Sequence, residues 1–193
     1  GTYNLLVGDS ASGKTFLALQ SLAEASVSPQ FKEHTLIYDA PESGARMDIT
    51  KFFGGSLDKR LRTPKEHLSK KSQMRSFTVE EFYYNLDFQL DGGPCVYVLD
   101  SMDALVSEDD QNKFQERKKA SEKGKEVSGT YGTGKAKANS ANLRMVLGKL
   151  EKTGSILIVI SQTRDNIGFT AQRNPKTRSG GKALRFYATS ECW

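Results

Sequence analysis

A short polar loop near the start of the chain, GDSASGKT at residues 8–15, is the feature that most restricts how the chain can fold. Its two glycines, followed at once by a lysine and a threonine, have the spacing G-x-x-x-x-G-K-[ST]. In loops of this pattern backbone N–H groups converge on phosphate oxygens, and the glycines allow the dihedral angles that such a turn requires. The loop therefore predicts phosphate binding, with a strand before it and a helix after it.

The residues on either side of the loop fit this prediction. Residues 3–7, YNLLV, form an apolar run of strand length, and residues 16–25, FLALQSLAEA, favour a helix. A Gly/Ser turn with a chance lysine is the alternative, and the flanking strand and helix argue against it. We expect Lys14 to reach the terminal phosphates of a nucleotide and Thr15 to help hold Mg²⁺. The residues expected to bind the nucleotide are Gly8, Asp9, Ser10, Ala11, Ser12, Gly13, Lys14, Thr15 and Phe16.

The composition limits the class of protein. A chain of 193 residues suffices for one well-buried domain, so we expect residues 1–193 to form a single core. The net charge of +5 favours a polyanionic partner. Two widely separated cysteines, Cys95 and Cys192, indicate reduced thiols in the cytoplasm. No apolar run approaches the ~20 residues that span a bilayer, so no membrane partner is expected.

The order of apolar and helix-favouring stretches predicts an α/β fold. The apolar stretches are continuous rather than alternating, which is typical of strands buried on both faces of a mainly parallel sheet flanked by helices. We expect strands at 4–7, 35–40, 95–100 and 155–161, and helices at about 14–26, 78–90 and 138–152. Thr78 is the expected cap of the second helix, and Asp91-Gly92-Gly93-Pro94 its expected end. Two long polar stretches, 106–137 and 164–182, are expected to be mobile loops.

Several polar residues follow the expected strands and would lie near the phosphates. Asp100 ends the strand VYVLD and is the expected Mg²⁺ ligand, although Asp103 is an alternative. Asp39 and Glu42 follow the second strand and are candidates for the group that orients the attacking water. Gln162 follows the fourth strand, and its position alone does not distinguish a phosphate contact from a solvated turn residue.

The combination of motifs resembles the RecA-type recombinases, the ATP-dependent filament proteins of homologous DNA strand exchange. The motifs are GDSASGKT, then VYVLDSMDAL, then LIVISQTRDNIGF, then NPKTRSGGKALRFYA, in that order. The resemblance covers about residues 3–189 and is weakest at 55–77 and 106–137. It implies a RecA-like P-loop NTPase core that hydrolyses ATP with Mg²⁺. We also expect this chain to be a piece of a longer protein, mostly monomeric and a poor ATPase by itself, whereas the whole protein forms homo-oligomeric filaments.

The resemblance also implies roles for individual residues. Lys14 would act on the phosphates, Thr15 and Asp100 would hold the metal, and Gln162 would couple the γ-phosphate to the following loop. The catalytic glutamate of the family follows the second strand in a DAE-like sequence, whereas this chain reads DAPE. Glu42 is one residue late when counted from Asp39, but it is in register when counted back from Gly54. We therefore assign the catalytic roles to Glu42, Lys14 and Gln162.

The two long polar stretches correspond to the family's DNA-contacting loops. Residues 113–137 carry eight Lys/Arg against three Glu, and residues 164–185 carry six against one Asp. Such a concentration of positive charge suits the backbone of single-stranded DNA. By resemblance Ile167 would wedge between stacked bases, although Phe169 is as well explained by packing on the core. The expected DNA-binding residues are Lys135, Lys137, Arg144, Arg164, Ile167, Gly168, Phe169, Arg178, Gly180 and Gly181.

Three functions remain compatible with these motifs. The first is a recombinase core that binds ATP and single-stranded DNA. The second is a RecA-fold motor or a KaiC-like ring ATPase, which would not be expected to carry the RSGGKALRFYA tail. The third is a binding module without turnover, which the displaced Glu42 leaves open.

Overall fold

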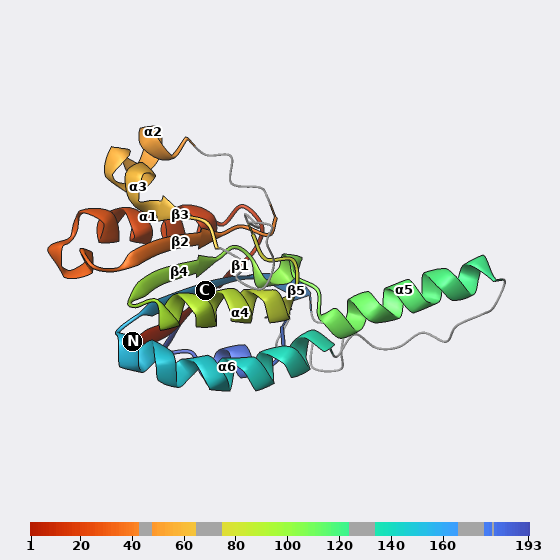
Figure 1. Cartoon of the computed structure of the whole chain (residues 1–193). Coiled ribbons are helices and arrows are strands. Elements are labelled where there is room, and N and C mark those ends of the chain that lie inside the picture. Colours follow the sequence, from red (N-terminus) through yellow and green to blue (C-terminus); the bar gives the residue numbers. More distant parts are fainter. Residues whose placement is uncertain (43–47, 65–74, 124–133, 166–175, 179) are drawn as a thin grey trace.

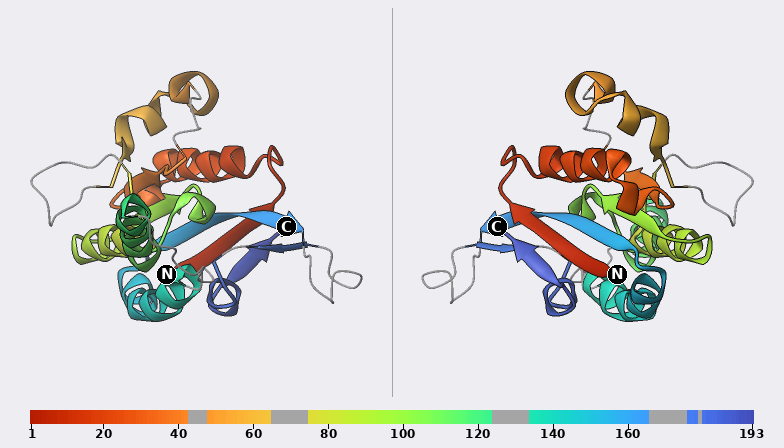
Figure 2. Two further views of the ribbon diagram at one scale, coloured as in Figure 1. Left: turned by 90° about the vertical axis from the view of Figure 1, so that its right-hand side faces the viewer. Right: turned by 90° about the vertical axis from the view of Figure 1, so that its left-hand side faces the viewer.

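The structure is a computed structural model that describes residues 1–42, 48–64, 75–123, 134–165, 176–178 and 180–193. These residues form three layers, with a central sheet between two layers of helices (Figures 1 and 2). The α/β class and the mainly parallel sheet flanked by helices are therefore confirmed. Within the described ranges, none of the helices combines the length and the apolar composition needed to cross a bilayer.

The central sheet contains six parallel strands in the order β3-β2-β4-β5-β1-β7. A seventh strand, β6, pairs antiparallel with the end of β5 and forms a hairpin with it. Parallel strands end at the same edge of a sheet, so the segments that follow β1, β2, β4 and β5 meet there. The strands are β1 (Thr2–Gly8), β2 (Thr35–Asp39), β3 (Leu61–Arg62), β4 (Cys95–Leu99), β5 (Ile156–Asp165), β6 (Lys176–Arg178) and β7 (Ser190–Cys192).

The helices cover the two faces of the sheet with separate hydrophobic clusters. One face is covered by α1 (Lys14–Val27), α2 (Ile49–Phe53) and α3 (Gly55–Arg60), and the other by α4 (Val79–Asp91), α6 (Gly134–Thr153) and α7 (Ala183–Phe186). The fully buried strand β4 serves both clusters, because successive side chains point to opposite faces. Val96 and Val98 pack on the α1 side, and Cys95, Tyr97 and Leu99 pack on the α4 side.

Most of the expected elements are present with small shifts of their ends. The helix α4 begins after Thr78, whose hydroxyl accepts from the Glu81 N–H while the Glu81 carboxylate accepts from the Thr78 N–H. This reciprocal capping box fixes the first turn. Gly92 caps the other end of the helix as expected. The strand β5 continues to Asp165, four residues further than the sequence suggests, because the antiparallel partner β6 extends it.

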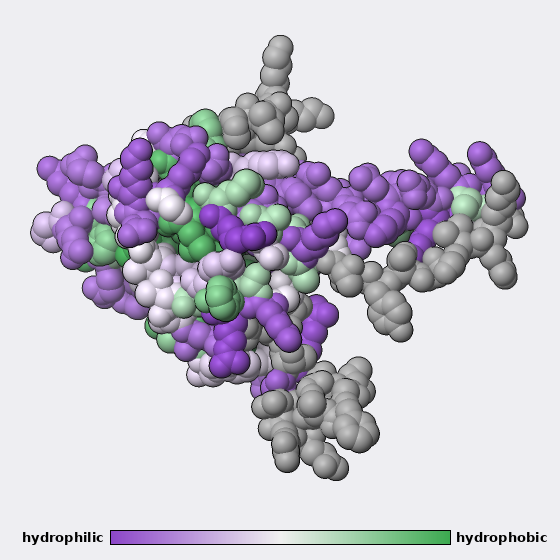
Figure 3. All heavy atoms as spheres, turned by 90° about the horizontal axis from the view of Figure 1, so that it is seen from below, coloured by the Kyte–Doolittle hydropathy of each residue, from purple (hydrophilic) through white to green (hydrophobic). Residues whose placement is uncertain are grey.

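The prediction of an irregular loop over residues 106–137 is wrong for its first half. A helix, α5 (Glu108–Glu122), occupies it, and α6 begins at Gly134 rather than at 138. None of the α5 residues is buried, so the helix leaves no apolar period in the sequence. Its signals are local: the Ser107 hydroxyl accepts from the Asp110 N–H, and Lys113 pairs with Asp109 one turn earlier. Figure 1 shows α5 projecting from the body, and Figure 3 shows its mostly hydrophilic surface.

Two further segments differ from expectation. The tail LRFYATSECW lies in the short helix α7 and then in β7, which pairs with β1, and this helix was not expected. The short elements α2, α3 and β3 were not predicted either. Two 3₁₀ turns, η1 (Pro29–Phe31) and η2 (Met102–Ala104), complete the described chain, and η2 lies directly after β4 at the edge where the site is built.

Candidate nucleotide-binding site

The phosphate loop joins the end of β1 to the start of α1. Gly13 precedes the helix with a φ of 87°, and Ala11 also has a positive φ, of 61°. At Gly8 an added Cβ would lie 2.7 Å from the Ser12 hydroxyl oxygen, so a side chain there would displace the loop. Glycine is therefore favoured at Gly13 by the positive φ and at Gly8 by the lack of space for a side chain.

The Lys14 side chain folds back over this loop. Its ammonium group donates to the carbonyl oxygens of Gly8 at 3.0 Å and Asp9 at 2.6 Å, and to the Ser12 hydroxyl at 3.2 Å. The positive charge is thus held at the mouth of the loop, at the N-terminus of α1, where the helix dipole also favours an anion. The loop, the lysine and the helix together form a site suited to phosphate oxygens.

A pocket of about 390 Å³ opens beside the loop at the carboxyl edge of the sheet. It brings together residues from four segments that are far apart in the sequence. The phosphate loop supplies one wall, and the ends of β2, β4 and β5 supply the others. Its lining residues are Ser10, Ala11, Ser12, Gly13, Lys14, Thr15, Phe16, Tyr38, Ala40, Glu42, Asp100, Ile160 and Gln162. Gly8 and Asp9 line a neighbouring pocket of about 460 Å³ instead.

Asp100 receives two hydroxyl hydrogen bonds beside this pocket. The Thr15 hydroxyl donates to Asp100 Oδ2 at 2.7 Å, and the Tyr38 hydroxyl donates to the same oxygen at 2.9 Å. Burial raises the pKa of Tyr38, and the Asp100 carboxylate raises it further, so the phenol stays protonated and remains a donor. Asp100 itself is buried, and the peptide bond that follows it is cis.

The pair of Thr15 and Asp100 fits a Mg²⁺ site of the kind completed by water and nucleotide phosphates. Mg²⁺ keeps several waters and needs only one or two protein oxygens. One hydroxyl and one carboxylate lie within hydrogen-bond distance of each other and next to the phosphate loop. No group of three or more acidic, histidine or cysteine side chains suited to a metal occurs among the described residues. A metal here would therefore depend on the nucleotide for further ligands.

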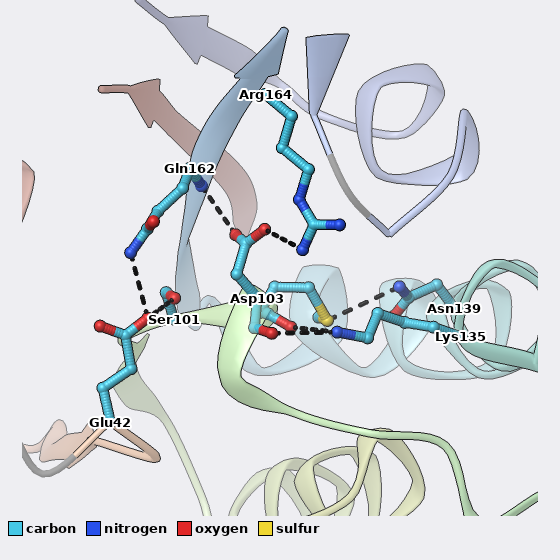
Figure 4. A network of polar contacts seen from close by, with 8 residues as sticks. Glu42, Ser101, Asp103, Lys135, Asn139, Gln162 and Arg164 are labelled. Atoms are coloured by element: carbon cyan, nitrogen blue, oxygen red, sulfur yellow. Dashed lines mark hydrogen bonds and ion pairs between the residues drawn. The ribbon is translucent and has the colours of Figure 1, made fainter. Parts of the chain in front are cut away.

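Glu42 and Gln162 both line the pocket and are hydrogen-bonded to each other (Figure 4). Glu42 Oε1 accepts from the Ser101 hydroxyl at 2.5 Å and from the Gln162 side-chain amide at 3.3 Å. Glu42 follows β2, Ser101 follows β4 and Gln162 lies on β5, so three neighbouring strands fix this cluster. The insertion of Pro41 has not removed Glu42 from the pocket, in agreement with the register counted from Gly54.

Two alternative acids from the sequence lie elsewhere. Asp103, the other candidate metal ligand, is not among the residues that line the pocket, and it accepts from the backbone N–H of Gln162 at 2.7 Å (Figure 4). Asp39, the other candidate base, is fully buried. It accepts from Ser76 through both the N–H and the hydroxyl, at 2.8 and 2.5 Å, and from the Tyr97 hydroxyl at 2.9 Å. Asp39 therefore has a structural role.

Asp9 links the phosphate loop to the β5–β6 hairpin. Its carboxylate accepts from the Thr163 hydroxyl on β5 and from the Lys176 ammonium on β6, the latter at 2.7 Å. These hydrogen bonds, with the charges of Lys176 and Lys14, hold the pKa of Asp9 below its usual value. Asp9 is thus part of the phosphate loop and also connects this loop to β5 and β6.

The described cations of the expected DNA-binding set differ in exposure and in their contacts. Lys137 and Arg144 are exposed on α6, and the Arg144 guanidinium donates to the Ser140 carbonyl of its own helix. Lys135 is half-buried, and its ammonium donates to the carbonyls of Met102 and Asp103, each at 3.2 Å. Arg164 is 60 % exposed and lies 3.7 Å from Asp103. Lys135 thus has a structural contact that its sequence position did not suggest.

The two glycines near α7 have a packing reason of their own. Gly180 and Gly181 both have a φ close to 90°, and a Cβ on Gly180 would lie 2.5 Å from Leu184 Cδ1. A Cβ on Gly181 would lie 2.7 Å from the Ala136 Cβ. Close approach to α6 and α7 explains both glycines without a phosphate. Arg178 lies on β6 opposite Thr163. The remaining expected contacts lie outside the described residues: Ile167, Gly168 and Phe169.

Sequence reasoning missed Tyr38 and Ser101, and it missed the actual partner of Asp103. Tyr38 directly precedes Asp39, and Ser101 directly follows Asp100. The sequence therefore placed both residues next to candidate acids but did not show where their side chains point. Asp103 was considered only as a metal ligand. Its actual partner is a backbone N–H on another strand, which no local pattern reveals.

This chain is similar to one family model and to several curated proteins. The family model described as the RecA N-terminal domain matches residues 92–192, just over half of the chain. The protein named RecA from Petrotoga mobilis is 28% identical over 188 residues, and that from Chlorobium limicola is 30% identical over 187. Each alignment covers 95% of this chain but only 43% and 45% of the relative.

RecA from Chlorobaculum parvum is 29% identical over 192 residues, which is 98% of this chain and 47% of the relative. The chain thus spans less than half of the length of the curated relatives it matches. The matched region of the family model includes β4, η2, β5 and the segment with Gly180, and the longer alignments extend over the phosphate loop. From the fold, the site and these matches together, we conclude that the chain belongs to the RecA family.

Proposed function

We propose that the chain is the ATP-binding core of a cytoplasmic recombinase that binds single-stranded DNA and hydrolyses ATP with Mg²⁺. The observation that carries the proposal is the pocket in which the phosphate loop, Thr15 with Asp100, and Glu42 with Gln162 face one another. The relatives named RecA support the same assignment. The complete protein is expected to act as a homo-oligomeric filament, and this part of it as a monomer.

The loop residues would bind and orient the triphosphate. Backbone N–H groups of residues 10–15 and the Lys14 ammonium would contact phosphate oxygens, after Lys14 exchanges its carbonyl partners for the phosphate. Thr15 and Asp100 would hold Mg²⁺, which when bound neutralises charge that develops on the phosphates. Phe16 is 48 % exposed at the pocket and would limit the access of water to it.

Glu42 would activate the attacking water. Its carboxylate accepts from Ser101 and Gln162, and the residue lines the pocket. A positioned carboxylate that accepts a proton contributes typically about 10²–10⁴-fold to a rate. Gln162 would contact the terminal phosphate, and Arg164 follows it after one residue on the same strand. A change at the phosphate can therefore reach the segment proposed to bind DNA.

The proposal is tested by measuring ATP hydrolysis as single-stranded DNA is titrated into the protein at low and at moderate salt. The matched control is Lys14→Ala, which removes the phosphate contact and leaves the basic segments intact. We expect a rate that rises with DNA, that rises less at moderate salt because phosphate contacts are screened, and that is absent in the control.

Other outcomes separate the alternatives. Hydrolysis that ignores single-stranded DNA would favour a motor or a KaiC-like ring ATPase. DNA binding that depends on ATP but occurs without turnover would favour a binding module. Hydrolysis that persists in Lys14→Ala would contradict the assignment of the phosphate site itself.

A further inference from the structure

The short turn η2 lies just after Asp100, which lines the nucleotide pocket, and it contacts one residue from each of the two basic segments, 113–137 and 164–185. Asp103, in this turn, accepts a hydrogen bond of 2.7 Å from the backbone N–H of Gln162. Its second carboxylate oxygen lies 3.7 Å from the Arg164 guanidinium (Figure 4). The main-chain oxygens of the same turn accept from the Lys135 ammonium. One turn of three residues therefore contacts both basic segments, at Lys135 and at Arg164.

The carboxylate of Asp103 is better fixed than the cations around it. Its side chain is 9 % exposed, whereas the Arg164 side chain is 60 % exposed. Burial lowers the pKa of Lys135 and the nearby Arg164 lowers it further, whereas Asp103 acts in the opposite direction. Asp103 thus offsets the repulsion between two cations that are held close together. Arg164 can leave the carboxylate for a phosphate without any loss of buried packing.

Asp103 is also connected to the pocket through a single residue. The Gln162 backbone is bound to Asp103, and the Gln162 side chain is bound to Glu42. A shift of the Gln162 backbone, when its side chain leaves Glu42 for a bound phosphate, would change the contact with Asp103. The same network continues through Asn139, which donates to the Gly180 carbonyl at 2.9 Å and lies 3.6 Å from the Met102 sulfur.

We propose that Asp103 is a positioning residue that holds Arg164 in the nucleotide-free protein and so weakens the binding of single-stranded DNA until a nucleotide is bound. This inference rests on the proposed function, because it concerns the regulation of the same site. The carboxylate competes with DNA phosphates for Arg164. When a nucleotide engages Gln162, the hold on Arg164 is reduced and the cation becomes available to the DNA.

The decisive variant is Asp103→Asn, which keeps an oxygen to accept the Gln162 N–H but removes the negative charge. We expect it to bind a fluorescein-labelled oligothymidylate about fivefold more tightly without nucleotide, a factor that corresponds to about 1 kcal/mol. With a slowly hydrolysed ATP analogue the gain is expected to be smaller. The ratio of the two affinities should therefore fall, and a role that is merely structural would not change this ratio.

The matched control is Asp87→Asn, which makes the same change in net charge and also removes an ion pair. Asp87 lies in the last two turns of α4 and pairs with Lys149 at 2.7 Å, and it is not among the residues that line the pocket. If both variants gain the same affinity for the oligonucleotide, the effect is one of general charge and the proposal is overturned.

Testing Asp103→Asn in a second variant as well separates the proposed effect from a general effect of the substitution on folding. In Arg164→Gln the partner of the carboxylate is absent, so the addition of Asp103→Asn should give little further gain in DNA affinity. Equal gains in both backgrounds would contradict the proposed hold on Arg164. The proposed function fails separately, if the wild-type protein binds no DNA in a salt-sensitive way. The inference fails alone, if the wild type responds to ATP and DNA but Asp103→Asn leaves the nucleotide dependence unchanged.

Discussion

The Thr15 hydroxyl donates a 2.7 Å hydrogen bond to Asp100, a residue 85 positions further along the chain. Thr15 lies in the first turn of α1 and Asp100 follows β4, so the contact joins the phosphate loop to the centre of the sheet. It places one neutral and one charged oxygen side by side, with Tyr38 donating to the same carboxylate oxygen. This pairing is the basis of the first prediction.

Thr15→Val is expected to lose the Mg²⁺-dependent part of ATP affinity. The substitution keeps the branched shape but removes the oxygen, and a loss of about tenfold would correspond to about 1.4 kcal/mol. Nucleotide binding measured by calorimetry, with Mg²⁺ and with EDTA, checks it. Thr15→Ser retains the hydroxyl and is the control. A valine variant with the same response to Mg²⁺ as wild type would remove Thr15 from the metal site.

Glu42→Gln is expected to reduce ATP hydrolysis by about 10²-fold or more while nucleotide affinity stays unchanged. The amide keeps an oxygen that can accept from Ser101 and Gln162 but is not a base. Single-turnover hydrolysis and nucleotide titration measure the two effects. The control is Glu33→Gln, an exposed glutamate after η1. If affinity and rate fell together, the role of Glu42 would be to shape the pocket.

Asp39→Asn is expected to change how stability depends on pH. Burial raises the pKa of Asp39, and its hydrogen bonds from Ser76 and Tyr97 act in the opposite direction. A folded-state pKa above the unfolded value of about 3.8 contributes stability that is fully present below that value and is lost as pH rises through the folded-state pKa. The free energy of unfolding of wild type minus that of Asp39→Asn should therefore decrease as pH rises from about 3.8.

Chemical denaturation at several pH values measures this difference. Tyr97→Phe removes one donor to the ionised carboxylate and should extend the decrease to higher pH. A difference between wild type and Asp39→Asn that is independent of pH would show that Asp39 has the same affinity for protons in the folded and unfolded states.

Gly180→Ala is expected to destabilise the fold by about 1–3 kcal/mol, because the residue has a positive φ and its Cβ would meet Leu184. Gly148→Ala is the control, for which we expect a change in stability of the opposite sign. Gly148 lies within α6 with open space around it, so alanine there should stabilise by up to about 1 kcal/mol. Thermal unfolding compares the two. A neutral Gly180→Ala would mean that α7 moves aside at little cost.

The sequence was sufficient to predict the site wherever a short pattern determines a local conformation. The phosphate loop, the strand before Asp100 and the capping of α4 are of this kind. The family resemblance implied a role for Glu42 and a role for Gln162, but it did not predict their contact across 120 positions of sequence. The resemblance did not predict the partners of Asp103 and Asp9. These partners lie on β5 and β6 and are selected by the packing of the whole sheet.

The failures have equally specific reasons. The helix α5 was read as a loop because the prediction relied on apolar period, and a helix with no buried residue has none. Its capping serine and its Asp109–Lys113 pair were visible in the sequence but were given no weight. Lys135 was assigned to DNA by its charge, and no local pattern in the sequence indicated that its ammonium also donates to two carbonyls of η2.

The exposed helix α5 has a consequence for experiment and for divergence among relatives. Since none of its fifteen residues is buried, substitutions on its surface leave both hydrophobic clusters intact. Selection for stability therefore places little restraint on its sequence, and its length and charge can change from one relative to another without loss of the nucleotide pocket. The same freedom makes α5 a suitable position for a fluorophore or an affinity tag.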